Sequence, residues 1–389
     1  MDILQEMQAV FEKHFGKEQT EAFFSPGRVN LIGEHTDYNG GNVFPCAISL
    51  GTYALVAKRA DKKLRLYSMN LADRGIIETG IEGLVYNERY DWGNYPMRVI
   101  RMFEDAGHKA DHGFDIVFYG NLPNGAGLSS SASLEVLMAV ILDDSFGFGL
   151  DRVEIIKLSQ AAENKFVGVN CGIMDQFAVG LGKENHAILL DCNTLVYRYS
   201  KIELDGCSIV ISNTNKKHSL GASKYNERRS ECESALRALQ KVKAIKSLGE
   251  LKNEEFDAIA DVIASPTERK RARHAVYENQ RTLQAVAALE RKDLTEFGRL
   301  MNASHVSLRD DYEVTGEELD TLAMLAWKQK GVIGSRMTGA GFGGCTVSIV
   351  KNDCIHAFEK NIGAAYTKKI GYAPSFYVAN IAAGARKIR

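Results

Sequence analysis

The sequence carries no excess of either charge and no long apolar run. Its 389 residues include 48 Lys and Arg against 49 Asp and Glu, which gives a net charge of −1. Proteins that bind nucleic acid or anionic membranes need a cationic face, so this balance argues against both kinds of partner. The longest apolar run, residues 136–142, is far shorter than the roughly 20 residues that span a bilayer. We therefore expect no nucleic acid and no membrane among the partners.

The sequence also has no CxxC pair and no HExxH motif, and we expect no export signal at its start. Asp2 and Glu6 lie where a signal peptide would be basic, and apolar residues at helical spacing predict an amphipathic first helix there. The seven cysteines are odd in number and scattered, so we expect free, buried thiols and a cytoplasmic location. The nine histidines form no ligand motif, so a built-in zinc site is not expected.

What is present is a soluble, globular composition, with 45% hydrophobic and 25% charged residues over a length that suits about two domains. Short β-like runs and two helical patterns precede residue 200, and longer helical patterns and two further β-like runs follow it. The β-like runs are 52–58, 64–68, 114–119, 186–190, 345–350 and 376–381, and the helical patterns are 133–143, 151–166, 225–243, 254–264 and 267–290. This irregular order predicts an α+β fold with domains at 1–200 and 201–389.

A glycine–serine segment, NGAGLSSSAS at residues 124–133, follows a predicted strand and opens an apolar helix. Glycines let a backbone approach an anion closely, and the free N–H groups of a helix start favour negative charge, so this segment predicts a phosphate-binding loop. It is neither a Walker A loop nor a dinucleotide fingerprint, because the lysine of the first and the third glycine of the second are missing. The alternative is an ordinary serine helix cap.

A second polar segment, residues 26–41, interleaves carboxylates, amides, an arginine and a histidine with four glycines. Such groups suit a polyhydroxylated ligand, because each sugar hydroxyl both donates and accepts hydrogen bonds. The alternative is a solvated polar loop. Together with the phosphate-binding loop, the segment favours an enzyme that joins a phosphate donor to a sugar.

The chain resembles the kinase family that comprises galactokinase, homoserine kinase, mevalonate kinase and phosphomevalonate kinase. GRVNLIGEHTDYNGG at 27–41 is similar to the signature of its galactokinases, LPNGAGLSSSASLE at 122–135 to the shared ATP loop, and SRMTGAGFGGCTV at 335–347 to the third motif. CGIMDQF at 171–177 and the segment 215–233 also fit, so the resemblance covers the whole chain in order. Ala340 departs mildly, because the third motif often continues its glycine run there.

The resemblance implies a two-domain small-molecule kinase with its active site in the cleft between the domains. Implied catalytic residues are Asp175, as the base, and Arg28 beside it. Implied sugar-binding residues are Glu34, His35, Thr36, Asp37, Gly172 and Tyr225. The nucleotide would be held by Ser68, Trp92, Asn124, Gly125, Ala126, Gly127, Leu128, Ser129 and Ser130, with Mg²⁺ on Ser130 and Glu163.

The implied reaction is ATP-dependent phosphorylation of the C1 hydroxyl of α-D-galactose by a monomer, giving galactose 1-phosphate and ADP as the first committed step of galactose catabolism. Asp175 could instead cap a turn, Glu163 could be an exposed helix residue, and Tyr225 could be a core aromatic. A kinase for N-acetylgalactosamine or another sugar is the nearest alternative function. A non-catalytic sugar and ATP sensor is a second alternative, but such relatives lack the Ser131–Ala132 pair that this chain has.

Overall fold

The computed structural model describes residues 2–123, 125–167, 171–216 and 221–389 of the chain. Its largest sheet has six strands in the order β13-β1-β3-β6-β4-β5. All neighbouring strands in it are antiparallel except the parallel pair β4 and β6. The strands are β1 (Glu21–Asn30), β3 (Pro45–Lys58), β4 (Lys63–Ser68), β5 (Ile77–Gly80), β6 (Phe114–Gly120) and β13 (Arg386–Lys387). The last strand of the chain thus pairs with the first.

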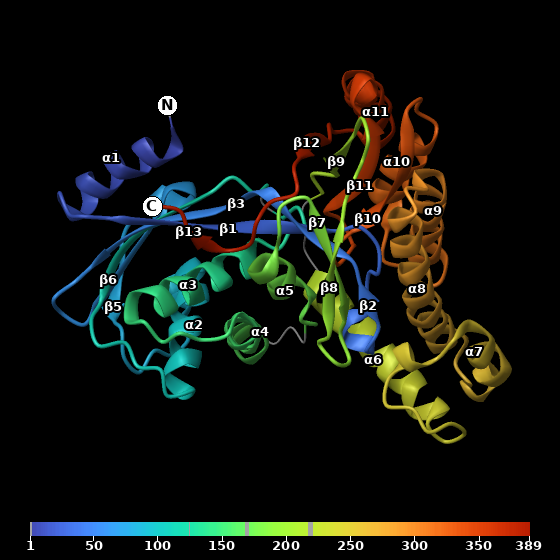
Figure 1. Ribbon diagram of the computed structural model, residues 1–389, viewed down its shortest axis with the longest axis horizontal. Helices are drawn as coiled ribbons and strands as arrows, with labels where there is room; N and C mark the ends of the chain where they lie inside the picture. The colour runs from blue at the N-terminus through green and yellow to red at the C-terminus, as the bar shows by residue number, and fades with distance from the viewer. Residues whose placement is uncertain (1, 124, 168–170, 217–220) are drawn as a thin grey trace.

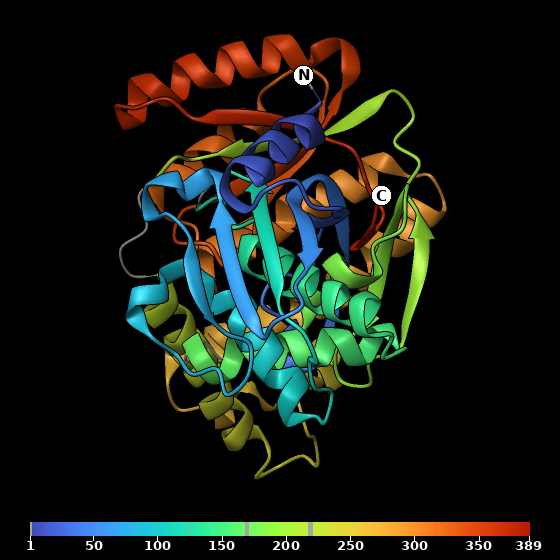
Figure 2. The ribbon, with the colours of Figure 1, turned by 90° about the vertical axis from the view of Figure 1, so that its left-hand side faces the viewer.

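Helices cover both faces of this sheet because successive strand residues point to opposite sides. Leu55 and Val117 face the amphipathic helix α1 (Ile3–Phe15), whereas Ala54 and Ile116 face the opposite helices. Those helices are α2 (Asn94–Asp105), α3 (Ser130–Phe146) and α4 (Arg152–Val167). Figure 1 shows α2, α3 and α4 below the sheet. In Figure 2, α1 (dark blue, next to the N label) lies above the strands and the green helices lie below them.

A second, four-stranded sheet lies in the other half of the molecule, with the order β10-β11-β9-β12. Its strands are β9 (Cys207–Asn213), β10 (Val332–Thr338), β11 (Cys345–Lys351) and β12 (Ser375–Ala379). On one face Ile209 and Ile211 pack with α8 (Pro266–Glu290) and α9 (Leu294–Asp310). On the other face Val210 packs with α10 (Gly316–Trp327) and α11 (Ile355–Ile370). Both faces of the sheet are therefore covered by helices, and the central residues 209–211 of β9 are apolar on both sides.

The two sheets share one core, which places β1 at the junction of the two halves. Val29 and Leu31 pack in the same cluster as Val347 of β11 and Phe297 of α9. A small third sheet, β2-β7-β8, packs with α5 (Met174–Leu181) near this junction. Its strands are β2 (Asn42–Val43), β7 (His186–Asp191) and β8 (Tyr197–Lys201). Two further helices, α6 (Gly221–Leu239) and α7 (Asn253–Ile259), complete the fold beside α8.

The α+β class and the predicted strands and helices are confirmed, with shifts at their ends. The helix predicted at 225–243 ends at Leu239, and the strand predicted at 376–381 ends at Ala379. Strand β1 was not predicted, because Pro26 and Gly27 interrupt its alternation of apolar and polar residues. The pairing of β1 with β3 is irregular between Pro26 and Arg28, and a strand tolerates proline at such a point. The division at residue 200 stays a prediction.

Two predictions from absent features can be compared with the structure. All seven cysteines are free, and Cys46, Cys232 and Cys345 are buried while the other four are half-buried. Among the residues that the structure describes, the helices are too short or too polar to cross a bilayer.

Candidate active site

Strand β1 brings Arg28 from the polar segment into a cavity between the two halves. Every residue of β1 after its first is buried, so the polar side chains here do not form a solvated loop. Gly27 is required at this point, because a Cβ there would lie 2.5 Å from Leu122 and 2.7 Å from the Leu128 carbonyl oxygen of the glycine–serine loop. This close approach places Arg28 beside that loop.

Arg28 and Asp175 form a bidentate ion pair, although 147 positions separate them in the sequence. Arg28 Nε donates to Asp175 Oδ1 and Nη2 to Oδ2, both at 2.9 Å. Arg28 Nη1 also donates to the Gly127 carbonyl oxygen at 2.6 Å, and the Ser129 hydroxyl donates to Asp175 Oδ2 at 2.6 Å. Asp175 lies in the first turn of α5 and does not merely cap a turn, since its carboxylate faces Arg28. The guanidinium is 4% exposed and the carboxylate 31%, so only the carboxylate is open to a ligand.

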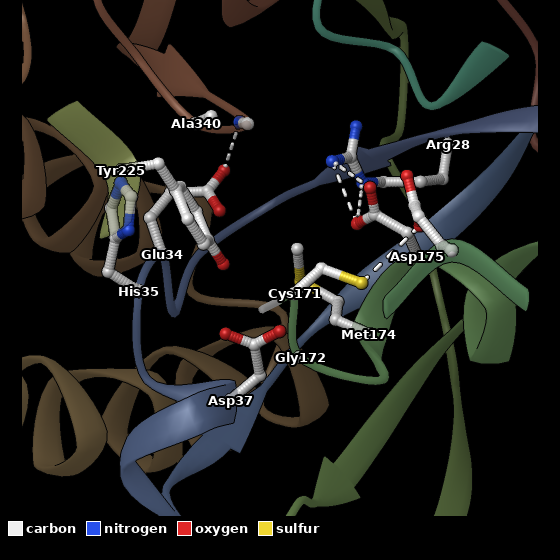
Figure 3. A pocket seen from close by; sticks show the side chains of 12 residues that line it. Arg28, Glu34, His35, Asp37, Cys171, Gly172, Met174, Asp175, Tyr225 and Ala340 are labelled. Atoms are coloured by element: carbon white, nitrogen blue, oxygen red, sulfur yellow. Dashed lines mark hydrogen bonds and ion pairs between the residues drawn. The ribbon is translucent and has the colours of Figure 1, made fainter. Parts of the chain in front are cut away.

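A cavity of about 200 Å³ lies next to this pair. Figure 3 shows Asp37, Glu34, Tyr225 and the Arg28–Asp175 pair arranged around it. The lining residues are Arg28, Glu34, His35, Asp37, Glu163, Cys171, Gly172, Met174, Asp175, Tyr225, Gly339 and Ala340. The structure thus gathers five of the six predicted sugar-binding residues. The sixth, Thr36, is not among these lining residues, because its buried hydroxyl donates to the Gly33 and Asn42 carbonyl oxygens and closes the loop.

The carboxyl groups of the cavity differ in their surroundings. Burial and, to a smaller extent, the charge of Asp175 raise the pKa of Asp37 to about 7. Gly172 lies against this carboxyl group, and a Cβ at position 172 would be 1.8 Å from Asp37 Oδ2. Glu34, by contrast, is 1% exposed and its carboxylate accepts hydrogen bonds from Asn30 and the Gly339 backbone N–H.

His35 and Tyr225 form the aromatic side of the cavity. The His35 ring packs against Tyr225, with ring centroids 5.6 Å apart, and its Nδ1 is 2.8 Å from the Tyr38 hydroxyl. Burial, followed by the nearby His274, lowers the pKa of His35 to about 3, so the ring is neutral. Burial raises the pKa of Tyr225 well above its usual value, so its hydroxyl keeps its proton and can donate to a ligand.

The glycine–serine loop borders a second hollow that opens from the same ion pair. Its lining includes Arg28, Asp175 and Ala340 together with residues 125–131. Gly125, Gly127 and Ser129 have φ of 65°, 68° and 62°, a conformation that glycine adopts freely and serine rarely. Ser129 occupies the N-cap of α3, but its side chain makes no cap hydrogen bond and turns to Asp175 instead. The interpretation of this segment as a simple serine helix cap is therefore wrong for Ser129. The predicted nucleotide contact Asn124 lies outside the residues that the structure describes.

A third hollow continues from this loop over the six-stranded sheet. It is lined by Thr52, Ser68, Asn70, Leu71, Trp92, Tyr95, Phe118, Gly120, Leu122, Ser130, Ser131 and Leu134. Ser68 and Trp92, the two nucleotide contacts predicted outside the loop, therefore share one hollow with Ser130. This hollow has an apolar, aromatic lining that suits the base of a nucleotide.

Glu163 projects from α4 toward the loop and meets Ser131, one residue after the predicted Ser130. The Ser131 hydroxyl donates to Glu163 Oε1 at 2.9 Å, and Gln176 Nε2 donates to Oε2 at 2.6 Å. Ser130 is exposed at the helix start. Burial, and then the charge of Asp175, raise the pKa of Glu163 above its usual value, so a bound cation would favour its ionised form. Glu163 is therefore not a simple exposed helix residue.

Several lining residues were not named from the sequence. Cys171 and Met174 flank the predicted Gly172 and Asp175, and Gly339 lies within the third glycine-rich motif, so their motifs alone carried a signal. Thr52 and Tyr95 also line the third hollow, and neither was among the residues predicted from the sequence. Only the packing of β3 and α2 brings them there.

Three family models match the chain in order. They are the galactokinase galactose-binding signature over residues 9–58, the N-terminal domain of the GHMP kinases over 94–183, and the C-terminal domain of the GHMP kinases over 285–358. The first model covers β1 and the polar segment 26–41, and the second covers the glycine–serine loop, Glu163 and Asp175. The matched models thus contain most of the cavity lining.

Similar proteins cover the chain from end to end. A galactokinase of Clostridium beijerinckii is 63% identical over 100% of both chains. The crystal structure of Lactococcus lactis galactokinase complexed with galactose has 52% identity and a TM-score of 0.97, covering 99% of this chain and 100% of that one. The Methanococcus jannaschii mevalonate kinase, at 17% identity and a TM-score of 0.66 over 95% of this chain and 99% of that one, shares the fold.

Proposed function

The chain belongs to the galactokinase family, and we propose that it transfers the γ-phosphoryl group of ATP to the C1 hydroxyl of α-D-galactose. The products would be galactose 1-phosphate and ADP, in the first committed step of galactose catabolism. The observation that carries this proposal is the Arg28–Asp175 ion pair, which lines both the cavity and the hollow of the glycine–serine loop. A group that borders both sites is where a sugar hydroxyl and a phosphoryl group would meet.

Asp175 is the proposed base. Three donors from Arg28 and Ser129 fix its carboxylate, so its position is set before a substrate binds. It would accept the proton of the C1 hydroxyl as that oxygen attacks phosphorus. Phosphoryl transfer proceeds through a loose transition state, so the proton can leave late and a weak but well-placed base suffices. Arg28 would act mainly through its charge, beside both the attacking oxygen and the phosphoryl group.

The glycine–serine loop would hold the nucleotide phosphates through its backbone N–H groups. Ser129 leaves the first N–H groups of α3 without a side-chain cap, and the helix dipole favours negative charge there. The aromatic hollow with Trp92 and Ser68 would hold the nucleoside.

The residues present also fit a magnesium ion. Mg²⁺ prefers hard oxygen ligands, and it is usually held by one or two protein groups with phosphates and water. The Ser131 hydroxyl and the Glu163 carboxylate are such oxygens, 2.9 Å apart; Ser131 lines the hollow of the glycine–serine loop and Glu163 lines the adjoining cavity. We propose these two residues, in place of the Ser130–Glu163 pair expected from the sequence, as its protein ligands. The ion would neutralise charge on the phosphate oxygens.

The polar groups that line the cavity beside the Arg28–Asp175 pair would provide sugar selectivity. Asp37 and Tyr225 reach the cavity from different elements, and both are buried enough that an unmet hydrogen bond is costly. A sugar with the wrong configuration at one carbon would leave such a group unpaired, which can reduce kcat/KM by about 10⁴. We propose that these two residues distinguish galactose from glucose.

The decisive experiment measures ATP-dependent ADP release with a panel of free hexoses, followed by NMR to locate the phosphate on the product. We expect turnover with galactose, little with glucose, and phosphate on C1. Turnover confined to N-acetylgalactosamine or another sugar would reassign the substrate. Sugar binding without ADP release would favour the sensor. Cytoplasmic location and a monomeric state stay predictions.

A further inference from the structure

The third glycine-rich motif contributes residues to the cavity beside the Arg28–Asp175 pair, and it does so from the opposite half of the molecule. Strand β10 ends at Thr338, and Gly339 and Ala340 after it line the cavity. The Gly339 backbone N–H donates to Glu34 Oε1 at 2.7 Å. A motif in the second half of the chain thus touches a carboxylate of the first half, on the proposed sugar side.

Arg336, on the same strand, is fully buried and lies between two buried carboxylates. Its Nη1 donates to the Asn30 carbonyl oxygen at 2.8 Å and to Glu34 Oε1 at 3.4 Å. Its Nε donates to the Ser304 hydroxyl at 3.1 Å, and its Nη2 is 4.0 Å from Glu278 Oε1. Burial alone would raise the pKa of Glu278. The charges of Arg281, His274 and Arg336 outweigh burial and lower this pKa to about 2, so the carboxylate is ionised. Arg336 thus compensates negative charge on both sides.

The donors among the residues that the structure describes leave Glu34 with one open acceptor site. An ionised carboxylate offers about four lone-pair sites. Oε1 accepts from Gly339 and Arg336, and Oε2 accepts from the Asn30 side chain at 3.0 Å. Three of the four sites are filled by the protein, and the remaining one is on Oε2. Because the Glu34 carboxylate lines the cavity, this site is available to a ligand hydroxyl.

We propose that Arg336 is a positioning residue for the sugar, which holds Glu34 so that its one open acceptor site meets a single hydroxyl of galactose. This inference rests on the proposed function. Loss of the Arg336 guanidinium group would let the Glu34 carboxylate rotate. It would also change the number of acceptor sites that this carboxylate offers to the sugar. Arg336 lies outside the set of residues that line the cavity, so it would act on the sugar indirectly, through Glu34 and through the Asn30 backbone beside it.

The test compares R336K with E34Q by calorimetric binding of galactose and of each monodeoxygalactose. Lysine keeps the charge between Glu34 and Glu278 but cannot reproduce the planar fork. We expect R336K to weaken galactose binding and raise its KM about 10- to 100-fold, as for a lost charge-assisted hydrogen bond. The KM for ATP should stay within about twofold. In both variants, removal of one and the same sugar hydroxyl should no longer reduce affinity.

S304A is the matched control, because it removes the partner of Arg336 Nε without touching Glu34. It should lower stability and leave the pattern of deoxygalactose affinities as in the wild type. If R336K does not fold, the double variant R336M/E278Q takes its place, because it removes one buried positive and one buried negative charge together. In this variant, too, removal of that same sugar hydroxyl should no longer reduce the affinity for the sugar. Three results for R336K would overturn the proposal: an unchanged KM for galactose, an equal rise in the KM for ATP, or a loss of affinity that is spread evenly over all the sugar hydroxyls. Absence of galactose binding to the wild type would instead contradict the proposed function.

Discussion

The proposed sugar side of the cleft is formed by buried side chains with fixed partners, whereas the proposed phosphate side is formed by an exposed glycine–serine loop. Glu34 and Arg336 are 1% and 0% exposed, and each has several protein partners. Gly125, Gly127 and Ser130 on the other side are exposed. The difference follows from the ligands. A sugar is recognised by the direction of each hydroxyl, which requires fixed partners, while phosphates need only N–H groups that a glycine-rich loop can present.

The comparison predicts that groups on the two sides affect different kinetic constants. Buried side chains on the sugar side should control the galactose KM and the stability of the protein. Residues of the loop should control the use of MgATP. The Arg28–Asp175 pair, which borders both sides, should control kcat.

The largest effect is expected for Asp175→Asn. An amide accepts no proton from the sugar hydroxyl, so kcat should fall by about 10²- to 10⁴-fold while both KM values stay near those of the wild type. Steady-state kinetics with galactose and ATP measure this. Ser129→Ala removes one of the three donors to Asp175 and should cause a much smaller loss of kcat. A near-native kcat for Asp175→Asn would show that the base has been wrongly assigned.

The next largest effect is expected for Gly172→Ala. The new Cβ would lie 1.8 Å from Asp37 Oδ2 and would displace that carboxyl group from the cavity. Displacement of a binding group by about 1 Å can cost about 100-fold, so the galactose KM should rise by that factor with no change for ATP. Gly80→Ala is the matched control, because a Cβ there meets no atom within 4 Å. Equal KM values for the two variants would contradict this account of the sugar side.

A smaller effect concerns His274, which supports the sugar side through the Glu34 carbonyl oxygen, 3.1 Å from its Nε2. Burial lowers the pKa of His274 from 6.5 to about 4. Below pH 6.5 the unfolded chain therefore binds a proton that the native protein does not, and the free energy of unfolding falls as pH falls toward 4. Chemical denaturation should show that His274→Gln loses about 2 kcal/mol less than the wild type between pH 7 and pH 5.

The comparison with the wild type isolates His274 from an opposing group. The pKa of Asp37 is raised to about 7, so in the same pH range the native protein binds a proton at Asp37 that the unfolded chain does not. That contribution is common to both proteins and cancels in the difference. Parallel pH profiles for the two proteins would mean that burial does not lower the pKa of His274.

The smallest effect distinguishes two neighbouring serines on the nucleotide side. Ser131→Ala removes the hydroxyl that contacts Glu163 and should raise the magnesium concentration needed for half-maximal activity about 10-fold at fixed ATP. Ser130→Ala should change this concentration less, because Ser130 is exposed. A larger effect at Ser130 would restore the ligand expected from the sequence.

The motifs predicted much of the site because they are local. Arg28, Asp37, Gly172 and Asp175 were identified from two short segments, and the structure brings all of them to one cavity. Thr36 belongs to the same segment, but its hydroxyl closes the loop instead of lining the cavity. A contiguous motif does not show which of its side chains point inward, because that depends on the turn that the backbone makes.

Two other details were beyond the sequence for a similar reason. Ser130 and Ser131 are chemically identical, and only the rotation of about 100° per residue at the start of α3 turns Ser131 toward Glu163. Arg336 stood within a recognised motif, but its partners Glu34 and Asn30 are about 300 positions away. No local pattern predicts such a pair.

The sequence by itself determined the α+β class, the glycine positions that permit the backbone of the glycine–serine loop, and the set of groups available for chemistry. These depend on local backbone freedom and on the spacing of apolar residues, which can be read along the chain. Tertiary structure alone decided which polar groups are buried together, and therefore which pKa values shift and which carboxylate keeps an open acceptor site. Burial and electrostatic interaction depend on distance in space, and the residues concerned lie far apart in sequence.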